Sequence, residues 1–420
     1  MMSEETGLPS GRILPMTRRP PIRPITLDVR KESYMTEEMV KETEVVVLGG
    51  GIAGVSTAYC LAKLGREVTL IEKTELVSGA SGANAAIIDL LWRQPGSDLK
   101  LGMASFDLYD HLTKELGYDI EFDQCGMLCP IETEAQFEEM KPFIEVRNKA
   151  GLLNARLVDR DEMLELEPNL SPSLVGAMWN PVDGHVNPMS AAYAFAEQAK
   201  KLGAKVYPNT KVLNITVERG RIKSVLTDQG EIGAKYVVNA CGIDAPVIGE
   251  KIGLKIPIVP NREQVIITEE IPNLVKRVLL GAGYKKTVEG GTSWATVAFY
   301  ANPQKKGNLL IGGVNDFPGE DRRTTFEALQ TISKVAIKFL PVLEAQRVHV
   351  IRSWARFYIH TPDGKPILGK VEGVKGFIMV GGLNDYGMGV GPGAGKAIAE
   401  LVCFGEPSIP IGDFSLSRFH

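Results

Sequence analysis

The sequence predicts an α/β protein of two domains, the first with a Rossmann-like sheet and the second an α+β domain on a mostly antiparallel sheet. Two observations predict the first domain. A strand, a glycine turn, a helix and a strand follow one another over residues 44–72, and a second glycine-rich strand-to-helix turn lies within residues 376–403. Short strand patterns between residues 264 and 312, followed by an amphipathic helix pattern over 324–339, predict the second sheet. The length of 420 residues agrees with two or three domains.

Composition and charge are those of an ordinary globular protein. The chain has 47 Lys and Arg against 51 Asp and Glu, a net charge of −4, and 44% of its residues are hydrophobic. Nucleic-acid-binding proteins are usually more basic, and disordered chains are less apolar. No uninterrupted apolar run reaches the ~20 residues that a membrane span requires. We therefore expect neither a nucleic-acid partner nor a membrane span.

The five cysteines do not suggest a disulfide framework. So few cysteines in 420 residues favour a reducing compartment, and we expect a cytoplasmic protein. Cys125 and Cys129 lack zinc-site spacing and a second pair, so no metal site is predicted.

The chain begins with a Pro- and Arg-rich extension over residues 1–42. It has too few apolar side chains to pack alone, and its prolines prevent a regular helix. A mobile tail and an arm lying on a partner subunit are both compatible with this composition.

The glycine turn near residue 50 carries the strongest signal. The β-branched strand 44–48 leads into the three glycines of a G-x-G-x-x-G motif, Gly49, Gly51 and Gly54, and then into a helix. The glycines allow a tight turn and a close approach of backbone N–H groups to a diphosphate. Glu72, at the end of the next strand, is placed to accept hydrogen bonds from an adenosine ribose, and its charge disfavours NADP. The motif predicts a bound dinucleotide.

Two further segments favour FAD over NAD. Residues 78–86 are a run of small and hydroxyl side chains, which would let backbone approach a second part of the ligand; a flexible surface loop is the alternative. The later turn, at residues 381–387, leads into a helix over 391–403. Its N-terminus would face the flavin atoms where negative charge gathers on reduction.

At this point the sequence resembles the D-amino-acid-oxidase-type flavoenzyme superfamily, in particular the group with sarcosine oxidase β subunits, glycine oxidase and dimethylglycine dehydrogenase. It looks most like the β subunits of heteromeric proline dehydrogenases. Besides the segments above, the motifs that carry the resemblance are D-G-H-V-N-P at 183–188, V-V-N-A-C-G-I-D-A at 237–245 and S-W-A-R-F-Y-I-H-T-P-D-G-K-P at 353–366.

The resemblance implies FAD bound between two domains. It implies a discontinuous FAD-binding domain over residues 43–130, 184–260 and 350–405, a substrate domain over 131–183 and 261–349, and a C-terminal tail over 406–420. The residues expected to bind the cofactor are Gly49, Gly51, Ile52, Ala53, Gly54, Glu72, Lys73, Ser81, Gly82, Ala83, Asn84, Val212, Ala240, Gly242, Gly382, Asn384, Gly387 and Met388.

The sequence departs from its relatives at three places. Ala83 stands where the family often has Arg. Relatives with covalent flavin carry Cys close to the position of Arg356, and Arg cannot form that bond, so the resemblance implies non-covalent FAD. Residues 384–387 read N-D-Y-G where many relatives have S-G-H-G.

The substrate side is predicted from the resemblance and from charge. An amino-acid carboxylate is bound well by Arg or by a Tyr hydroxyl. The candidates are Tyr358, Arg93, Arg356, Tyr300, Asp385 and Tyr386. Tyr358 is the first choice, with an ordinary strand aromatic as its alternative. Asp385 is a pocket acid for the substrate ammonium or a simple turn residue.

The predicted function is FAD-dependent oxidation of an amino acid or secondary amine, such as proline, sarcosine or another N-substituted amino acid. A hydride would pass from the carbon beside nitrogen to flavin N5 and leave an imine. The resemblance also implies a partner α subunit. Two alternatives stay open: a non-catalytic FAD-containing assembly or electron-relay subunit, and an NADH-using flavin reductase or monooxygenase.

Overall fold

The computed structural model describes residues 39–152, 154–283, 295–319 and 321–419. Residues 1–38 of the predicted N-terminal extension and Trp294, the first residue of the strand predicted at 294–300, lie outside the described residues. The elements below all belong to the unit Val40–His420.

The first sheet contains eight strands within the described residues. Its continuous order is β17 (Ile367–Lys370), β18 (Phe377–Gly381), β11 (Gly230–Asn239), β1 (Glu42–Leu48), β2 (Val68–Ile71) and β8 (Lys205–Tyr207). The hairpin of β9 (Val212–Glu218) and β10 (Arg221–Thr227) extends from β11. β1, β2, β8, β11 and β18 run parallel, so their carboxyl ends meet at one edge.

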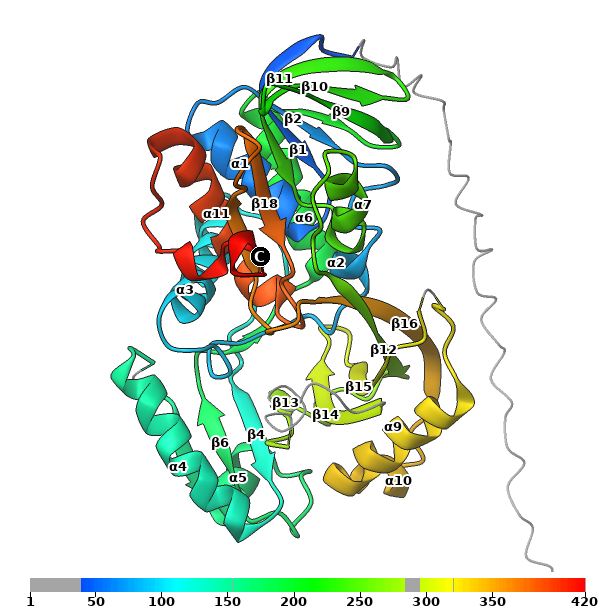
Figure 1. Cartoon of the computed structure of the whole chain (residues 1–420). Coiled ribbons are helices and arrows are strands. Elements are labelled where there is room, and N and C mark those ends of the chain that lie inside the picture. Colours follow the sequence, from blue (N-terminus) through cyan, green and yellow to red (C-terminus); the bar gives the residue numbers. More distant parts are fainter. Residues whose placement is uncertain (1–38, 153, 284–294, 320, 420) are drawn as a thin grey trace, which may run out of the picture. The chain divides into compact units, whose positions relative to one another are not determined.

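Helices pack against this sheet and against one another (Figure 1). α1 (Ile52–Lys63) contacts α6 (Pro188–Lys201) and α11 (Gly387–Phe404), and α11 contacts α3 (Ser97–Asp110). Every residue of α1 from Ile52 to Ala62 is buried. An almost wholly apolar helix is stable only when other elements surround it, which explains its central position.

The second sheet also contains eight described strands. Their order is β16 (Val350–His360), β12 (Val259–Thr268), β15 (Leu309–Asp316), β14 (Ala295–Pro303), β13 (Val278–Leu280), β4 (Met127–Ile131), β6 (Gly176–Asn180) and β5 (Arg156–Asp159). All neighbouring pairs are antiparallel except β13 and β4. The predicted mostly antiparallel second sheet is therefore confirmed.

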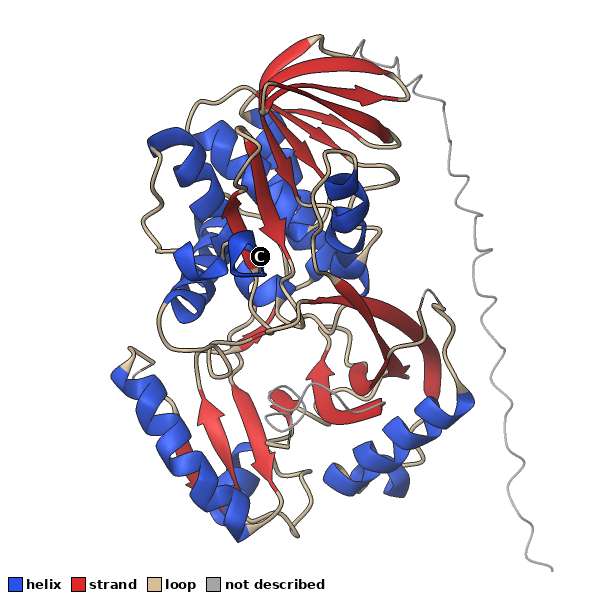
Figure 2. Cartoon of the chain, in the orientation of Figure 1, coloured by secondary structure: helices blue, strands red, loops and turns tan. Residues whose placement is uncertain are grey.

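Helices cover this sheet in two groups (Figure 2). α9 (Phe326–Phe339) packs on β12, β14 and β15, with α10 (Val342–Ala345) beside it. The rings of Phe299 and Phe339 stack with centroids 4.2 Å apart in this layer. α4 (Glu134–Lys149) and α5 (Arg160–Leu166) pack on β5 and β6. Other short elements include β3 (Ile87–Ile88), paired with β7 (Gly184–His185), and the helices α2 (Ala80–Ala83) and α7 (Ala245–Glu250).

The structure differs from the sequence prediction in three respects. β4 and β16 fall in the segments predicted for the FAD-binding domain, but their hydrogen-bonded neighbours are strands of the second sheet. α11 begins at Gly387 rather than near residue 391. α3 was not predicted, because its pattern has no strong apolar periodicity and Gly102 interrupts it.

None of the described helices is long and apolar enough to cross a membrane.

Candidate functional site

A cleft with about 1040 Å³ of empty space lies at the carboxyl edge of the first sheet. Gly49 follows β1, Glu72 follows β2 and Ala240 follows β11, and all three line the cleft. Ligands of open α/β sheets bind at this edge because the strand-to-helix turns meet there.

The N-terminus of α1 faces the cleft, because Gly51, Ile52 and Ala53 all line it. Its N-cap, Gly51, makes no side-chain cap hydrogen bond, and the first turn has no acidic residue. The Ile52 amide donates to the Ser81 hydroxyl at 3.0 Å. A Cβ on Gly54 would lie 1.9 Å from the Gly49 carbonyl oxygen, so only glycine allows α1 to approach the turn this closely. This helix end fits a diphosphate.

Glu72 ties the glycine turn to the end of β2. Its carboxylate accepts hydrogen bonds from the amides of Gly50 (2.8 Å) and Thr74 (2.9 Å). The Thr74 hydroxyl also donates to Oε1 (3.0 Å), so Oε2, which accepts only from Gly50, keeps acceptor capacity that suits a ribose hydroxyl. Lys73, which also lines the cleft, forms an exposed ion pair with Asp244 (2.6 Å).

The small-residue segment after Glu72 forms a close turn over the cleft. A Cβ on Gly82 would meet the Val77 carbonyl oxygen at 2.1 Å. The Asn84 side chain donates to the Ser81 carbonyl (2.6 Å) and accepts from the Ala86 amide (2.6 Å), so it holds the turn rather than reaching outward. The Ala83 carbonyl accepts hydrogen bonds from two side chains of β16 described below.

A second pocket, with about 770 Å³ of empty space, adjoins the cleft. The two cavities share Ile52, Ala80, Ser81 and Gly387 as lining residues. The N-terminus of α11 opens here: Tyr386 is its N-cap without a side-chain hydrogen bond, and its first turn has no acidic residue. The uncapped ends of α1 and α11, together with Glu72, make a donor and acceptor set that fits FAD, with the flavin ring at the junction.

One face of the second sheet forms a wall of this pocket. Tyr358 from β16, Glu263 from β12 and Tyr300 from β14 all line it. Burial raises the pKa of both tyrosines well above the ordinary value, so both hydroxyls are protonated donors.

Arg356 lies behind this wall and faces the cleft. It stands directly opposite Glu263 in the register of β16 and β12 and forms a salt bridge with it; the two side chains are 0% and 3% exposed. The same guanidinium donates to the hydroxyls of Tyr358 (2.6 Å) and Tyr300 (2.9 Å) and to the Ala83 carbonyl (2.8 Å). Trp354 donates its indole N–H to the same carbonyl (2.9 Å).

β15, which lies between the strands of Glu263 and Tyr300, has glycines at the two positions next to their side chains. A Cβ on Gly313 would be 2.3 Å from Glu263 Oε1, and one on Gly312 would be 2.2 Å from the Tyr300 hydroxyl oxygen. Any other residue at these positions would displace the two side chains from the pocket wall.

The turn before α11 supplies the opposite wall. Asn384 has a φ of 51°, in the left-handed region. Its side-chain Nδ2 donates to the carbonyls of Gly364 and Gly382 (both 2.9 Å), and these hydrogen bonds stabilise the left-handed backbone. Asp385 lines the pocket and accepts a hydrogen bond from His360 (2.8 Å). Burial lowers the pKa of His360, but the hydrogen bond and charge of Asp385 outweigh it, and the net shift is upward.

Arg93 lies outside the lining of both cavities. Its side chain is fully buried, forms an ion pair with Asp89 (3.4 Å) and stacks on the Tyr386 ring at 3.3 Å. Asp89 and Tyr386 line the pocket, so Arg93 supports the wall from behind.

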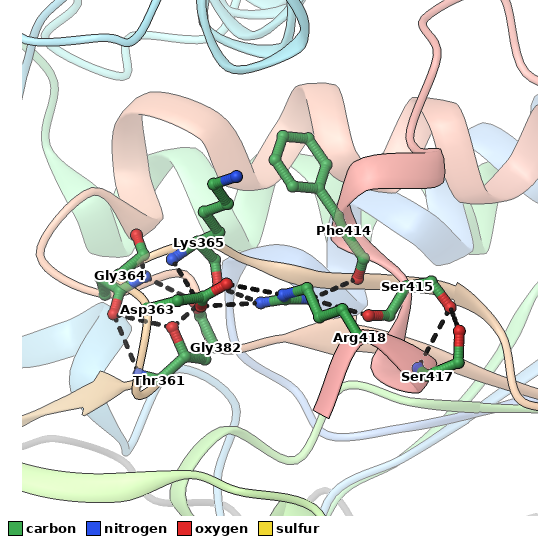
Figure 3. Close-up of polar contacts among 10 residues, drawn as sticks. Thr361, Asp363, Gly364, Lys365, Gly382, Phe414, Ser415, Ser417 and Arg418 are labelled. Atoms are coloured by element: carbon green, nitrogen blue, oxygen red, sulfur yellow. Dashed lines mark hydrogen bonds and ion pairs between the residues drawn. The ribbon is translucent and has the colours of Figure 1, made fainter. Parts of the chain in front are cut away.

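The C-terminal segment fixes the loop over residues 361–366, which is hydrogen-bonded to Asn384 of this turn (Figure 3). Arg418 forms two hydrogen bonds with the Asp363 carboxylate (2.7 and 3.0 Å) and donates to the Lys365 carbonyl (2.9 Å). Thr361 donates its hydroxyl to the same carbonyl (2.8 Å) and its amide to Asn384 (3.1 Å).

Most of the predicted site residues line the two cavities, and a few lie elsewhere. Besides Arg93, the predicted residues Gly54, Gly82, Val212 and Gly382 line neither; Gly382 packs against Thr361, and Val212 begins β9. The sequence analysis missed Glu263 and Asp89. An acid two residues before the apolar run 265–267 and a Gly-Gly pair inside a strand were the available signals for Glu263.

Comparisons with known proteins show the family of the chain. The family described as FAD dependent oxidoreductase, DAO, matches residues 44–401. Dimethylglycine dehydrogenase of Mus musculus is 29% identical over 96% of this chain and 47% of its own length. Sarcosine oxidase subunit beta of Rhodobacter capsulatus is 27% identical over 93% of this chain and 91% of its own. The structure of L-proline dehydrogenase from P. horikoshii superposes with a TM-score of 0.83, at 30% identity, over 91% and 98% of the two chains.

The chain spans less than half the length of the first curated relatives that it matches. The family match nevertheless covers both sheets and both cavities. The chain therefore belongs to the DAO family of FAD-dependent oxidoreductases.

Proposed function

We propose that this enzyme oxidises a secondary amine or N-substituted amino acid, such as proline or sarcosine, to the imine. Bound FAD supplies the hydride acceptor, at N5 of its ring. The observation that carries the proposal is the junction of the two cavities: a cleft that fits FAD opens at its ring end into a separate pocket lined by phenols and carboxylates.

The pocket residues position the substrate. The hydroxyls of Tyr300 and Tyr358 are protonated and converge on one wall, where they suit a substrate carboxylate. Asp385 offers a carboxylate on the other wall, where it suits the substrate nitrogen. Held between these groups, the carbon beside nitrogen would face the flavin, and such fixed geometry accounts for much of the rate of a hydride transfer.

An anaerobic screen of the yellow holoenzyme tests this function. The holoenzyme is mixed with proline, hydroxyproline, sarcosine, glycine or an opine-type amine. The absorbance of oxidised flavin, at about 450 nm, is then followed. We expect at least one of these amines to bleach the flavin within seconds, while NADH does not. If no amine bleaches the bound flavin, the result favours a non-catalytic assembly or electron-relay subunit.

We also propose that the FAD is held without a covalent bond. Arg356 lies on the cleft wall, close to where relatives with covalent flavin carry Cys, and an Arg side chain cannot form that covalent bond. Four hydrogen-bond partners fix its side chain. Acid precipitation of the holoenzyme should leave the flavin in the supernatant. Yellow colour that stays in the pellet would contradict a non-covalent site.

A partner subunit is a further part of the proposal. The match to sarcosine oxidase subunit beta, over nearly the full length of both chains, supports a role as the catalytic subunit of a heteromeric complex with an α subunit. Native mass measurement of the enzyme purified from its source cells should give a mass that includes a second polypeptide. A homogeneous species of this chain alone would argue against the heteromer.

A further inference from the structure

Arg356 is a buried charge that has one ion-pair partner among the described residues. Its guanidinium is always protonated and its side chain is 0% exposed, so it needs a negative charge beside it at every stage of a reaction. Glu263 supplies that charge from the directly opposite position on β12. If Glu263 were to become neutral, another anion would have to take its place.

Arg356 does not itself line the pocket, so an anion from the pocket would reach the guanidinium by displacing a group that covers it. The groups that cover the guanidinium on this side are Glu263, Tyr300 and Tyr358, and all three line the pocket. The buried Nε of Arg356 has no hydrogen-bond partner among the described residues, so one donor is spare. Within the described chain, no Lys, Arg or His lines this pocket, and the neighbouring bases Arg93 and His360 already face Asp89 and Asp385.

Glu263 is suited to accept a proton. Burial raises the pKa of its carboxyl, and the charge of Arg356 opposes this only in part. The titratable groups that face it are Arg356, Tyr358 and His360 on β16, Tyr300 on β14, and Asp385 before α11. A second anion near Arg356 would weaken the attraction that keeps Glu263 ionised, so the pKa of Glu263 would rise further.

From this charge balance we propose that Glu263 accepts the proton of the substrate ammonium while the substrate carboxylate replaces Glu263 as the partner of Arg356. An N–H bond of the ammonium breaks, an O–H bond forms on Glu263, and the lone pair stays on nitrogen, so the step involves no oxidation. The inference rests on the proposed function and narrows it: the substrate is an amino acid whose carboxylate and ammonium enter together. Two ion pairs are thereby replaced by one ion pair with a neutral acid and a neutral amine, and burial favours the arrangement with fewer charges.

Proton uptake on binding tests the exchange without turnover. Acetate and pyrrole-2-carboxylate carry the carboxylate but no ammonium, so each should force Glu263 to take a proton from solvent. We expect the wild-type holoenzyme to take up about one proton per probe bound, measured by calorimetry in buffers of different ionisation enthalpy, and to bind the probe about tenfold more tightly per unit fall in pH. A zwitterionic substrate should bind with no net uptake, because its own ammonium supplies the proton.

Two Glu→Gln variants test whether Glu263 is the group that takes up the proton. In Glu263→Gln, proton uptake should vanish and the probes should bind at least tenfold more tightly near pH 8, because the competing carboxylate is gone. Glu269→Gln makes the same change on an exposed side chain directly after the C-terminal end of β12, and this variant should behave as wild type. Should Glu263→Gln not fold, the wild-type uptake measurement alone decides.

Binding of the probes to wild type without proton uptake would overturn the exchange. So would a folded Glu263→Gln enzyme that binds them no more tightly than wild type. Failure of every amine to bleach the flavin is a different result, because it refutes the proposed function and leaves the binding measurement readable.

Discussion

Opposite charges face each other in pairs around the pocket beside the cleft. Glu263 faces Arg356, Asp385 faces His360, and Asp89 faces Arg93, with the carboxylate toward the pocket in each pair and the base behind it. Charged groups are retained in buried positions when each has a partner and further hydrogen bonds. The pairs hold the pocket wall in one arrangement, and they make its residues sensitive to pH and to the loss of one partner.

His360 predicts a pH dependence of stability. Its pKa in the folded protein is raised above the ordinary value of 6.5, so the folded state binds the proton more tightly than the unfolded state does. The stabilisation is complete below pH 6.5 and is lost as pH rises through the folded-state pKa. Urea unfolding of wild type and His360→Gln between about pH 5.5 and 8.5 should show a difference, of order 1 kcal/mol or less at low pH, that shrinks as pH rises. A difference that grows with pH would contradict the assignment.

Tyr358 predicts an effect on catalysis rather than on cofactor binding. Tyr358→Phe removes a hydroxyl that contacts Arg356 at 2.6 Å on the pocket wall, but leaves the ring in place. We expect kcat/KM for the best amine to fall about tenfold or more, because one charge-assisted hydrogen bond is lost, with unchanged flavin content. Tyr193→Phe, at a half-exposed position on α6, is the matched control. Loss of flavin from the Tyr358 variant would place the residue in the cofactor site instead.

At the scale of elements, the turn between β1 and α1 depends on contacts that leave no space for a side chain. Gly54→Ala would place a Cβ 1.9 Å from the Gly49 carbonyl oxygen and push α1 away from the turn. FAD affinity should fall at least tenfold, measured by fluorescence titration of the apoprotein. Gly412→Ala, where a Cβ would meet no atom within 4 Å, should bind FAD like wild type. Equal affinities of the two variants would show that the close approach does not matter for binding.

The predictability of the site follows from sequence separation. Gly49, Gly51 and Glu72 lie within one strand–helix–strand unit, and the local pattern was enough to predict their common cleft. Glu263 and Arg356 are 93 residues apart and meet only because β12 and β16 pair in one register. Arg418 meets Asp363 through the path of the C-terminal segment, which carries no pattern in the sequence. Strand pairing between distant segments is fixed by tertiary packing, so the FAD cleft was predictable and the substrate wall was only partly so.

At the scale of the whole molecule, one cavity system connects two sheets. The carboxyl edge of the first sheet supplies the FAD cleft, and a face of the second sheet supplies the pocket wall. A ligand held by both should stabilise them together. We expect FAD added to apoprotein at about 100 times its Kd to raise the free energy of unfolding by about 2.7 kcal/mol, seen as a rise in Tm. An unchanged Tm under these conditions would mean that FAD does not bind the folded chain.

The central claim is that the chain holds an amine with its N-bearing carbon against the flavin and removes a hydride from that carbon. The most direct measurement is anaerobic stopped-flow bleaching of the flavin by the best amine from the screen, compared with the same amine deuterated at that carbon. The claim predicts bleaching that is several-fold slower with deuterium, because the C–H bond breaks in the observed step. Equal rates for the two amines in a single turnover, with chemistry rather than binding limiting, would contradict it.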